Sequence, residues 1–119
     1  MSAGEINSPI KEKGETMEVQ VYSDAVPKYS PWGAIDDKEK YAPGIWFVTT
    51  PSHGGIWLSP ERRKEINRKS PFLGSAAWWE EDCDCVIPIV FFANSILSFS
   101  PGKAELVKTC RKYLEGRQK

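Results

Sequence analysis

The fold is decided by the stretch Gly44-Ile45-Trp46-Phe47-Val48-Thr49-Thr50-Pro51-Ser52-His53-Gly54-Gly55-Ile56-Trp57-Leu58-Ser59. Two runs rich in aromatic and β-branched residues, 44–50 and 54–59, flank a Pro-Ser-His-Gly segment, a pattern typical of a β-hairpin. One register pairs Ile45 with Leu58, Trp46 with Trp57, and Phe47 with Ile56, and makes Thr50–His53 the loop. It sets large apolar side chains opposite one another. Both hairpin faces are then apolar, so we expect each to be covered or to form an interface.

Helix signals follow the hairpin. Ser59-Pro60-Glu61 predicts a helix over 60–69, because serine caps, proline is tolerated at the first position and an acid suits the first turn. Its charges are interpreted as a solvated face; they are Arg62, Arg63, Lys64, Arg68 and Lys69, partly offset by Glu61 and Glu65. Ser100-Pro101 repeats the start signal. The stripe Leu106, Val107, Cys110, Tyr113, Leu114 then predicts a C-terminal helix ending near Gly116.

The stretch 76–98 is compatible with two structures. Its apolar run Cys85–Phe92 contains Pro88. A buried strand would disfavour that proline, whereas a helix tolerates it in an early position and favours acids in its first turn. We therefore favour a helix that begins in the acidic run 80–84.

The N-terminal part is more polar. Met17–Tyr22 alternates apolar and polar residues and predicts a half-buried strand, whereas 23–43 is predicted to be a loop with Trp32 in a turn. We expect a flexible leader over 1–16, a single domain over 17–116 and a polar tail over 117–119. The predicted fold class is α+β, a small antiparallel sheet around the hairpin at 44–59, packed with two or three helices.

Composition limits the functional classes. The 119 residues include 16 Lys and Arg against 16 Asp and Glu, which argues against a dedicated nucleic-acid binder and leaves a homodimer open. Three cysteines without framework spacing indicate no disulfide scaffold. No apolar run reaches membrane-spanning length and no signal core is present. We expect a cytoplasmic protein without a membrane association or a cofactor.

Two segments carry groups suited to acid–base chemistry. His53, the only histidine, precedes two glycines in the predicted loop. It is either a general base or metal ligand, or a residue that shapes the turn. Glu80, Glu81 and Asp82 could share a proton, divide into acid and base, or hold a divalent cation. On a helix, Glu80 would share a face with Asp84; equally, the acids could simply favour the helix N-terminus.

The thiols suggest weaker alternatives. Cys83 could pair with His53 as a nucleophile, but neighbouring acids raise a thiol pKa. Three cysteines and one histidine could form a zinc site, yet no Cys-x-x-Cys pair is present. We therefore predict no resident metal. The candidate binding residues are aromatic, small or polar, and lie in or near the same segments: Trp32, Ser52, Gly54, Gly55, Trp57, Trp78 and Trp79.

The order of several motifs resembles a known family. They are Ser30-Pro31-Trp32-Gly33, Gly44, Thr50-Pro51-Ser52-His53-Gly54-Gly55, Leu58-Ser59, Arg62 and Trp79-Glu80-Glu81-Asp82-Cys83. Over about residues 30–92 the chain is similar to a family of uncharacterised domains in bacterial, plasmid and phage proteins. The resemblance implies a shared fold, a mobile-element context and a joint site at His53, Glu80, Glu81 and Asp82. It implies no reaction.

Two main functions follow. The leading hypothesis is a non-enzymatic interaction module that contacts a protein partner through its tryptophan-bearing hairpin and the segment 80–84; the mobile-element context suggests a host-defence partner. The alternative is a small hydrolase or transferase with His53 as base and the carboxylates of 80–82 as acid or cation ligands. A third is a structural homo-oligomer formed through the two-faced hairpin.

Overall fold

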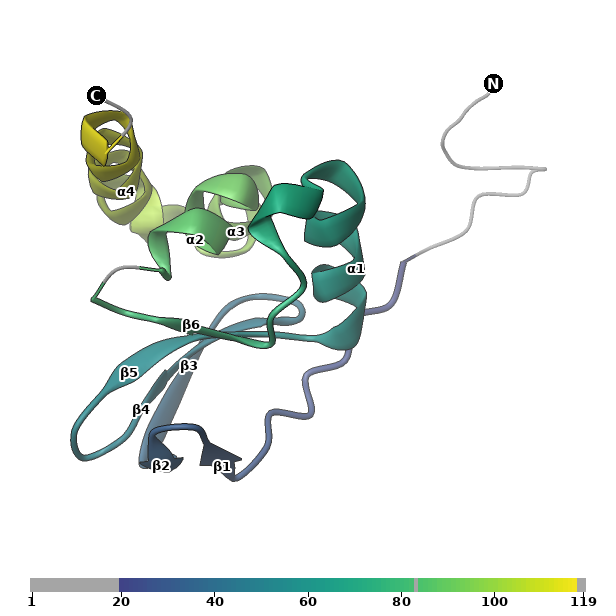
Figure 1. Cartoon of the computed structure of the whole chain (residues 1–119), viewed down its shortest axis with the longest axis vertical. Helices are drawn as coiled ribbons and strands as arrows, with labels where there is room; N and C mark the ends of the chain where they lie inside the picture. Colours follow the sequence, from purple (N-terminus) through teal and green to yellow (C-terminus); the bar gives the residue numbers. More distant parts are fainter. Residues whose placement is uncertain (1–19, 83, 118–119) are drawn as a thin grey trace, which may run out of the picture.

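A computed structural model of the chain describes residues 20–82 and 84–117. Its centre is a four-stranded antiparallel sheet in the order β3-β4-β5-β6. The strands are β3 (Asp37–Ala42), β4 (Ile45–Thr49), β5 (Gly54–Leu58) and β6 (Trp78–Glu80). The helices are α1 (Pro60–Lys69), α2 (Val86–Phe91), α3 (Ala93–Phe99) and α4 (Ala104–Arg117), with 3-10 turns at Pro71–Leu73 and Pro101–Lys103. Figure 1 shows the helices gathered on one face of the sheet, so the predicted α+β class is confirmed.

The hairpin formed by β4 and β5 has the predicted register. Ile45 faces Leu58, Trp46 faces Trp57, and Phe47 faces Ile56. The loop is closed by the Thr50 backbone N–H, which donates to the His53 carbonyl at 2.7 Å. Apolar cross-strand pairing and a short loop thus suffice to specify this part of the sheet.

Helix α1 has the predicted bounds and begins with the predicted cap. The Ser59 hydroxyl accepts a hydrogen bond from the Arg62 backbone N–H at 3.2 Å, and Pro60 occupies the first helical position. At the other end of the chain, α4 runs past Gly116, its predicted end, to Arg117. Helix α1 therefore starts where local sequence signals place it, whereas Ser100-Pro101 opens the 3-10 turn Pro101–Lys103 and α4 follows from Ala104.

The main core lies between the sheet and the helices. Ile45, Ile56 and Leu58 point from the sheet into it, and Ile66 of α1 and Ile96 of α3 close it from the helical side. All five side chains are fully buried. Alternate residues of each strand face this core. The remaining strand residues point to the opposite face of the sheet, which another part of the chain must cover.

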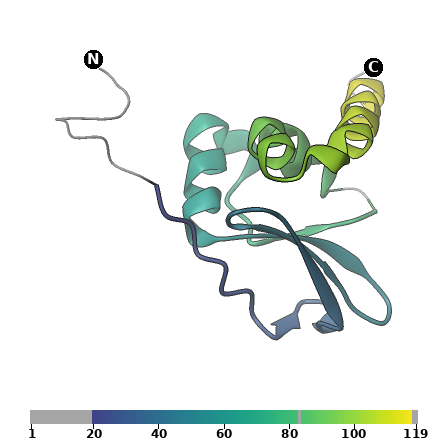
Figure 2. The ribbon, with the colours of Figure 1, turned by 180° about the vertical axis from the view of Figure 1, so that it is seen from behind.

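The outer face of the sheet is covered by the chain that precedes it. Trp46, Trp57 and Trp78 lie opposite one another on β4, β5 and β6 and form a row on this face. The segment 24–36, with the short strands β1 (Tyr29–Ser30) and β2 (Gly33–Ala34), runs down to this side of the sheet, as Figures 1 and 2 show. Both hairpin faces thus have cover within the chain, although Trp46 and Trp78 are only half-buried.

Asp24 anchors this covering segment. Its carboxylate accepts hydrogen bonds from the Trp46 indole N–H at 2.9 Å, the Gly44 backbone N–H at 2.8 Å and the Lys40 ammonium at 2.9 Å. Burial alone would raise the pKa of Asp24, but these donors outweigh it and hold the pKa below its usual value. One carboxylate thus joins the covering segment to two strands.

Two N-terminal expectations are corrected. The predicted strand Met17–Tyr22 falls partly outside the described residues, and Gln20–Tyr22 is not a strand. The predicted loop 23–43 contains β1, β2 and β3. Its charged run Asp37–Lys40 forms the edge strand β3, where charged side chains remain in solvent and discourage pairing with another chain. The predicted leader 1–16 lies outside the described residues.

In the stretch 76–98 the apolar run Cys85–Phe92 is helical rather than a buried strand, and a short strand that the sequence did not predict, β6, precedes it. The predicted helix exists as α2, with Pro88 in its first turn, where proline is tolerated. It begins only at Val86, however, and its first turn holds no acid. Glu80 ends β6 instead, and Glu81 and Asp82 lie in the following turn. The acidic run therefore begins at the end of a strand and not in a helix, because pairing with β5 keeps the chain extended up to Glu80.

Candidate functional site

The loop between β4 and β5 holds His53 by its backbone. The His53 carbonyl accepts hydrogen bonds from both the N–H and the hydroxyl of Thr50, and the His53 N–H donates back to that hydroxyl at 3.0 Å. Thr50 itself is buried. The base of the imidazole is therefore anchored, although its ring lies at the surface. Threonine three residues before His53 was the sequence signal for this anchor, because its hydroxyl can close a local turn.

The structure brings His53 together with two of the three predicted carboxylates. The His53 Nδ1 atom lies 3.5 Å from the Glu80 Oε2 atom. One donor atom from each of His53, Glu80 and Asp82 lies within 4.8 Å of the other two. The side chains of His53 and Glu80 are 45% and 35% exposed. We call these three residues the His53 corner, the region of the described chain where an imidazole and carboxylates could hold a proton or a cation.

Glu81 is turned away from this corner. A Cβ atom on Gly54 would lie 3.1 Å from the Glu81 Oε1 atom and 3.4 Å from the ring of Phe47, which packs against the main core. The Glu81 N–H donates to the Gly54 carbonyl at 2.9 Å, so the pairing with β5 continues to Glu81 and its side chain points to the opposite side of the sheet from Glu80. The joint site implied by the resemblance thus contains three of its four residues.

An aromatic pair lies beside the corner. The ring of Trp32 meets the ring of Trp78 edge-on, with centroids 5.9 Å apart. Trp32 also covers Gly55, where an added Cβ would lie 2.7 Å from its ring. Gly55 is the cross-strand partner of Glu80, so Trp32 lies next to the corner on the outer face. Segments far apart in the sequence therefore meet at one place.

The other predicted binding residues divide by burial. Trp57 is 2% exposed and Trp79 is 5% exposed, and Gly54 and Gly55 are also buried. Ser52 is exposed in the loop. Trp79 packs in the main core and Trp57 is buried on the outer face of the sheet. Of the predicted tryptophans, only Trp32 and Trp78, both half-buried, therefore remain at the surface.

Two hollows in the surface lie away from the corner. One, of about 480 Å³, is lined by residues between Val26 and Lys38. The other, of about 290 Å³, is lined by residues that include Tyr22, Arg62 and Ser95. Neither has a residue of the His53 corner in its lining. The imidazole and the carboxylates of the corner therefore lie outside these two hollows.

The cysteines do not form the predicted alternatives among the described residues. Cys83 lies outside them, so its pairing with His53 has no structural description here. Cys85 and Cys110 are buried. Burial raises the pKa of the Cys110 thiol, which keeps it protonated and poorly nucleophilic.

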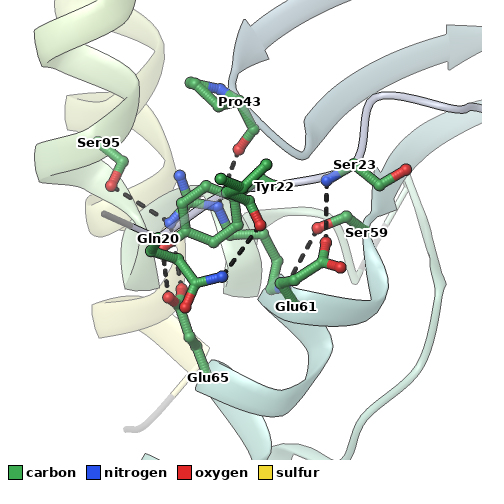
Figure 3. A network of polar contacts seen from close by, with 10 residues as sticks. Gln20, Tyr22, Ser23, Pro43, Ser59, Glu61, Glu65 and Ser95 are labelled. Carbon is green, nitrogen blue, oxygen red and sulfur yellow. Dashed lines mark hydrogen bonds and ion pairs between the residues drawn. The ribbon is translucent and has the colours of Figure 1, made fainter. Parts of the chain in front are cut away.

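A second polar cluster surrounds Arg62, which the sequence placed on a solvated helix face. Arg62 is instead only 4% exposed. Its guanidinium donates to the Pro43 carbonyl at 3.0 Å, to the Glu65 carboxylate at 3.1 Å and to the Ser95 hydroxyl at 3.5 Å (Figure 3). The spacing of Arg62 and Ile66, four residues apart on one helical face, was the signal that could have predicted this burial.

The segment before the sheet covers this arginine. The Tyr22 ring stacks on the guanidinium, with the Arg62 Cζ atom 3.6 Å from the ring centroid, and the Tyr22 hydroxyl donates to Glu65 (Figure 3). Burial and the hydrogen bond with Glu65 raise the pKa of Tyr22 to about 12. We call Tyr22, Pro43, Arg62, Glu65 and Ser95 the Arg62 network. Its buried charge is paired and hydrogen-bonded, as a structural role requires.

In the part of the chain that the structure describes, no helix has both the length and the apolar character needed to cross a membrane.

Comparison with known proteins identifies a family. A family model described as a domain of unknown function (DUF7007) matches residues 25–117. No curated protein matches the chain, and no solved structure does so. The match covers the sheet, all four helices, the His53 corner and Arg62, whereas Tyr22 and Asp24 pack onto the domain from just before it. The chain therefore belongs to the family of the domain of unknown function DUF7007.

Proposed function

We propose that this chain is a small protein-interaction module whose contact surface is the His53 corner together with Trp32 and Trp78. One observation carries the proposal: an aromatic pair, half-buried and held by packing, adjoins an exposed histidine and two carboxylates on one face. Aromatic anchors beside polar groups are typical of protein interfaces. Binding a partner should therefore cost little conformational entropy, because the loop that carries His53 and the two tryptophans are already held in place.

The composition of this surface supports binding. Aromatic side chains beside an imidazole and carboxylates offer both apolar and polar contacts to a partner. The acidic charge of 80–84 suits a partner with a basic contact patch, since complementary charge speeds association. The mobile-element and host-defence context implied by the family resemblance is part of this proposal and names where such a partner would be sought.

The first test locates the contact. A photo-crosslinking residue is introduced at Ser52, exposed beside His53, and separately at Lys112, exposed on α4. We expect the residue at position 52 to crosslink one partner in cells. The residue at position 112 should not crosslink that partner. The same partner crosslinked equally from both positions would contradict a surface centred on the corner.

The second test measures affinity for that purified partner. The double variant Glu80→Gln/Asp82→Asn removes two charges from the corner, and Glu105→Gln/Glu115→Gln removes two from exposed positions of α4. We expect the first to weaken binding roughly tenfold, about 1.4 kcal/mol, and the second to leave it unchanged. Unchanged affinity in the first variant would refute the proposal.

A second candidate function is acid–base catalysis at the same corner. The observation that favours it is the approach of His53 to Glu80, since a carboxylate beside an imidazole can orient it as a general base. Asp82 rather than Glu81 would then supply the second carboxylate. A hydrolase or transferase activity lost in His53→Gln and Glu80→Gln, but kept in Asp84→Asn, would establish it. Equal activity in all three variants would exclude it.

A further inference from the structure

We propose that His53, Glu80 and Asp82 form a binding site for a divalent transition-metal cation of the zinc or manganese type. The proposal goes beyond the interaction module and does not need a partner to be present. It also revises the expectation from sequence that the chain holds no resident metal, and it takes up the alternative that these carboxylates hold a divalent cation.

The distances within the His53 corner fit shared coordination better than a hydrogen bond. The 3.5 Å between His53 Nδ1 and Glu80 Oε2 exceeds the usual hydrogen-bond length of about 2.7–3.2 Å. Two ligand atoms each about 2.1 Å from one tetrahedral ion lie about 3.4 Å apart. The three donor atoms already lie within 4.8 Å of one another, so small side-chain rotations would bring them to an ion.

The ligands stand on backbone that is already held in place. Thr50 anchors His53 on both its N–H and its carbonyl. The Glu80 carbonyl accepts the N–H groups of Asp84 and Cys85 at 2.9 and 2.8 Å, which fixes the turn that carries Asp82. An ion would therefore order side chains and not loops, and a site of this kind loses little entropy on binding.

The charge around the corner is unbalanced. Glu80, Glu81, Asp82 and Asp84 lie within five consecutive residues. Over residues 20–82 and 84–117, no lysine or arginine forms an ion pair with any of them. By contrast, Asp24, Glu39 and Glu65 each have a cationic partner. A divalent cation would supply the missing positive charge, and His53 would add the nitrogen ligand.

The donor set indicates which cations should bind. Imidazole suits zinc and other transition metals, and carboxylates suit manganese as well as magnesium and calcium. One imidazole with two carboxylates should therefore prefer Zn²⁺ and Mn²⁺ to Mg²⁺, which dehydrates reluctantly and favours oxygen ligands. Three protein ligands also leave a coordination position for water or for a group from another molecule.

The experiment uses the full chain and the metals themselves. Mn²⁺ is added below one equivalent to the ¹⁵N-labelled protein, and the paramagnetic broadening of backbone NMR signals is followed. We expect broadening centred on 52–54 and 80–82. Glu115, an exposed acid of α4 without a histidine beside it in the sequence, is the internal control and should broaden much less. Equal broadening at Glu115 would mean only general attraction to acids and would overturn the proposal.

Variants then test the ligands by calorimetric titration with Zn²⁺. We expect His53→Gln and Asp82→Asn each to weaken binding tenfold or more, and Asp84→Asn, with the same charge change as Asp82→Asn, to weaken it less than twofold. If Zn²⁺ still binds with unchanged affinity after His53→Gln, for example because neighbouring thiolates hold it, the proposal is contradicted. Equal losses in Asp82→Asn and Asp84→Asn would contradict it too. Unchanged thermal midpoints confirm that the variants fold.

Discussion

The Arg62 network and the His53 corner are both clusters of charged side chains, yet the structure treats them in opposite ways. Arg62 is buried, donates to three partners and is balanced by Glu65. His53 and Glu80 are partly exposed, are 3.5 Å apart, and belong to an acidic run without lysine or arginine partners in the described chain. A satisfied buried charge maintains the fold, whereas an unbalanced exposed cluster is available to bind.

The largest expected effect comes from breaking the buried cluster. Arg62→Met leaves Glu65 without its cation and the Pro43 carbonyl without its donor. We expect the free energy of unfolding to fall by about 3 kcal/mol, as for a buried pair that loses one partner. Chemical denaturation measures this loss.

His53→Gln is the matched test in the exposed cluster and should change the same free energy by less than about 0.5 kcal/mol. Similar losses in the two variants would remove the distinction between a structural and a binding cluster.

A smaller effect is expected at the glycine that supports the corner. A Cβ atom at residue 55 would lie 2.2 Å from the Trp79 carbonyl oxygen and 2.7 Å from the Trp32 ring. Gly55→Ala should therefore lower stability by roughly 1–3 kcal/mol through overpacking and move β6 away from β5. Gly102→Ala, where the added atom meets open space, is the control and should cost little. A stable Gly55→Ala protein would show that β6 and Trp32 shift readily to admit the added atom.

Tyr22→Phe separates the hydrogen bond of the Arg62 network from its packing. The Tyr22 hydroxyl donates to Glu65, and its loss should cost about 1 kcal/mol at neutral pH. The pKa of Tyr22 is raised to about 12 in the folded state, above its ordinary value of about 10. This contribution is therefore fully present below pH 10 and is lost as the pH rises toward 12.

The measurement for Tyr22 is denaturation of both proteins at neutral pH and again between pH 10 and 12. The difference between wild type and Tyr22→Phe should shrink over the alkaline range. Tyr29→Phe, at an exposed tyrosine, should show no such difference at neutral pH. A difference that grows with pH would show that the phenolate, and not the phenol, is the favoured state.

The smallest effect is expected in the corner itself. Glu80→Gln/Asp82→Asn reduces repulsion within the acidic run, so stability should stay the same or rise by up to about 0.5 kcal/mol. Thermal unfolding at low salt measures the change, and added salt should diminish it. A loss above 1 kcal/mol would mean that these carboxylates maintain the fold, as Glu65 does.

The hairpin and its following helix were predictable because their signals are local. The apolar pairing of 45–47 with 56–58 and the Ser59-Pro60 helix start each act over a few residues. The strand β3 was missed because its charged residues resemble a loop, and only its place at the sheet edge makes them suitable for a strand. Local signals thus succeed where the neighbours are near in sequence.

The His53 corner shows what local sequence signals did not predict. Its residue types were predicted, but on a helix Glu80 would have been grouped with Asp84. In the structure Glu80 joins Asp82, because β6 ends at Glu80 and the turn closed on the Glu80 carbonyl places Asp82 near it. The burial of Arg62 likewise depends on Tyr22, Pro43 and Ser95, which lie 40, 19 and 33 residues away in the chain.

The sequence by itself therefore determined the hairpin register and the helix start at Ser59, since cross-strand pairing and capping depend on neighbouring side chains. Only the tertiary structure decided which carboxylates meet His53, which tryptophans remain at the surface and that Arg62 is buried. Those outcomes depend on contacts between segments that are distant in the sequence. These contacts, and not local preference, decide which side chains are buried and where the chain is paired as a strand.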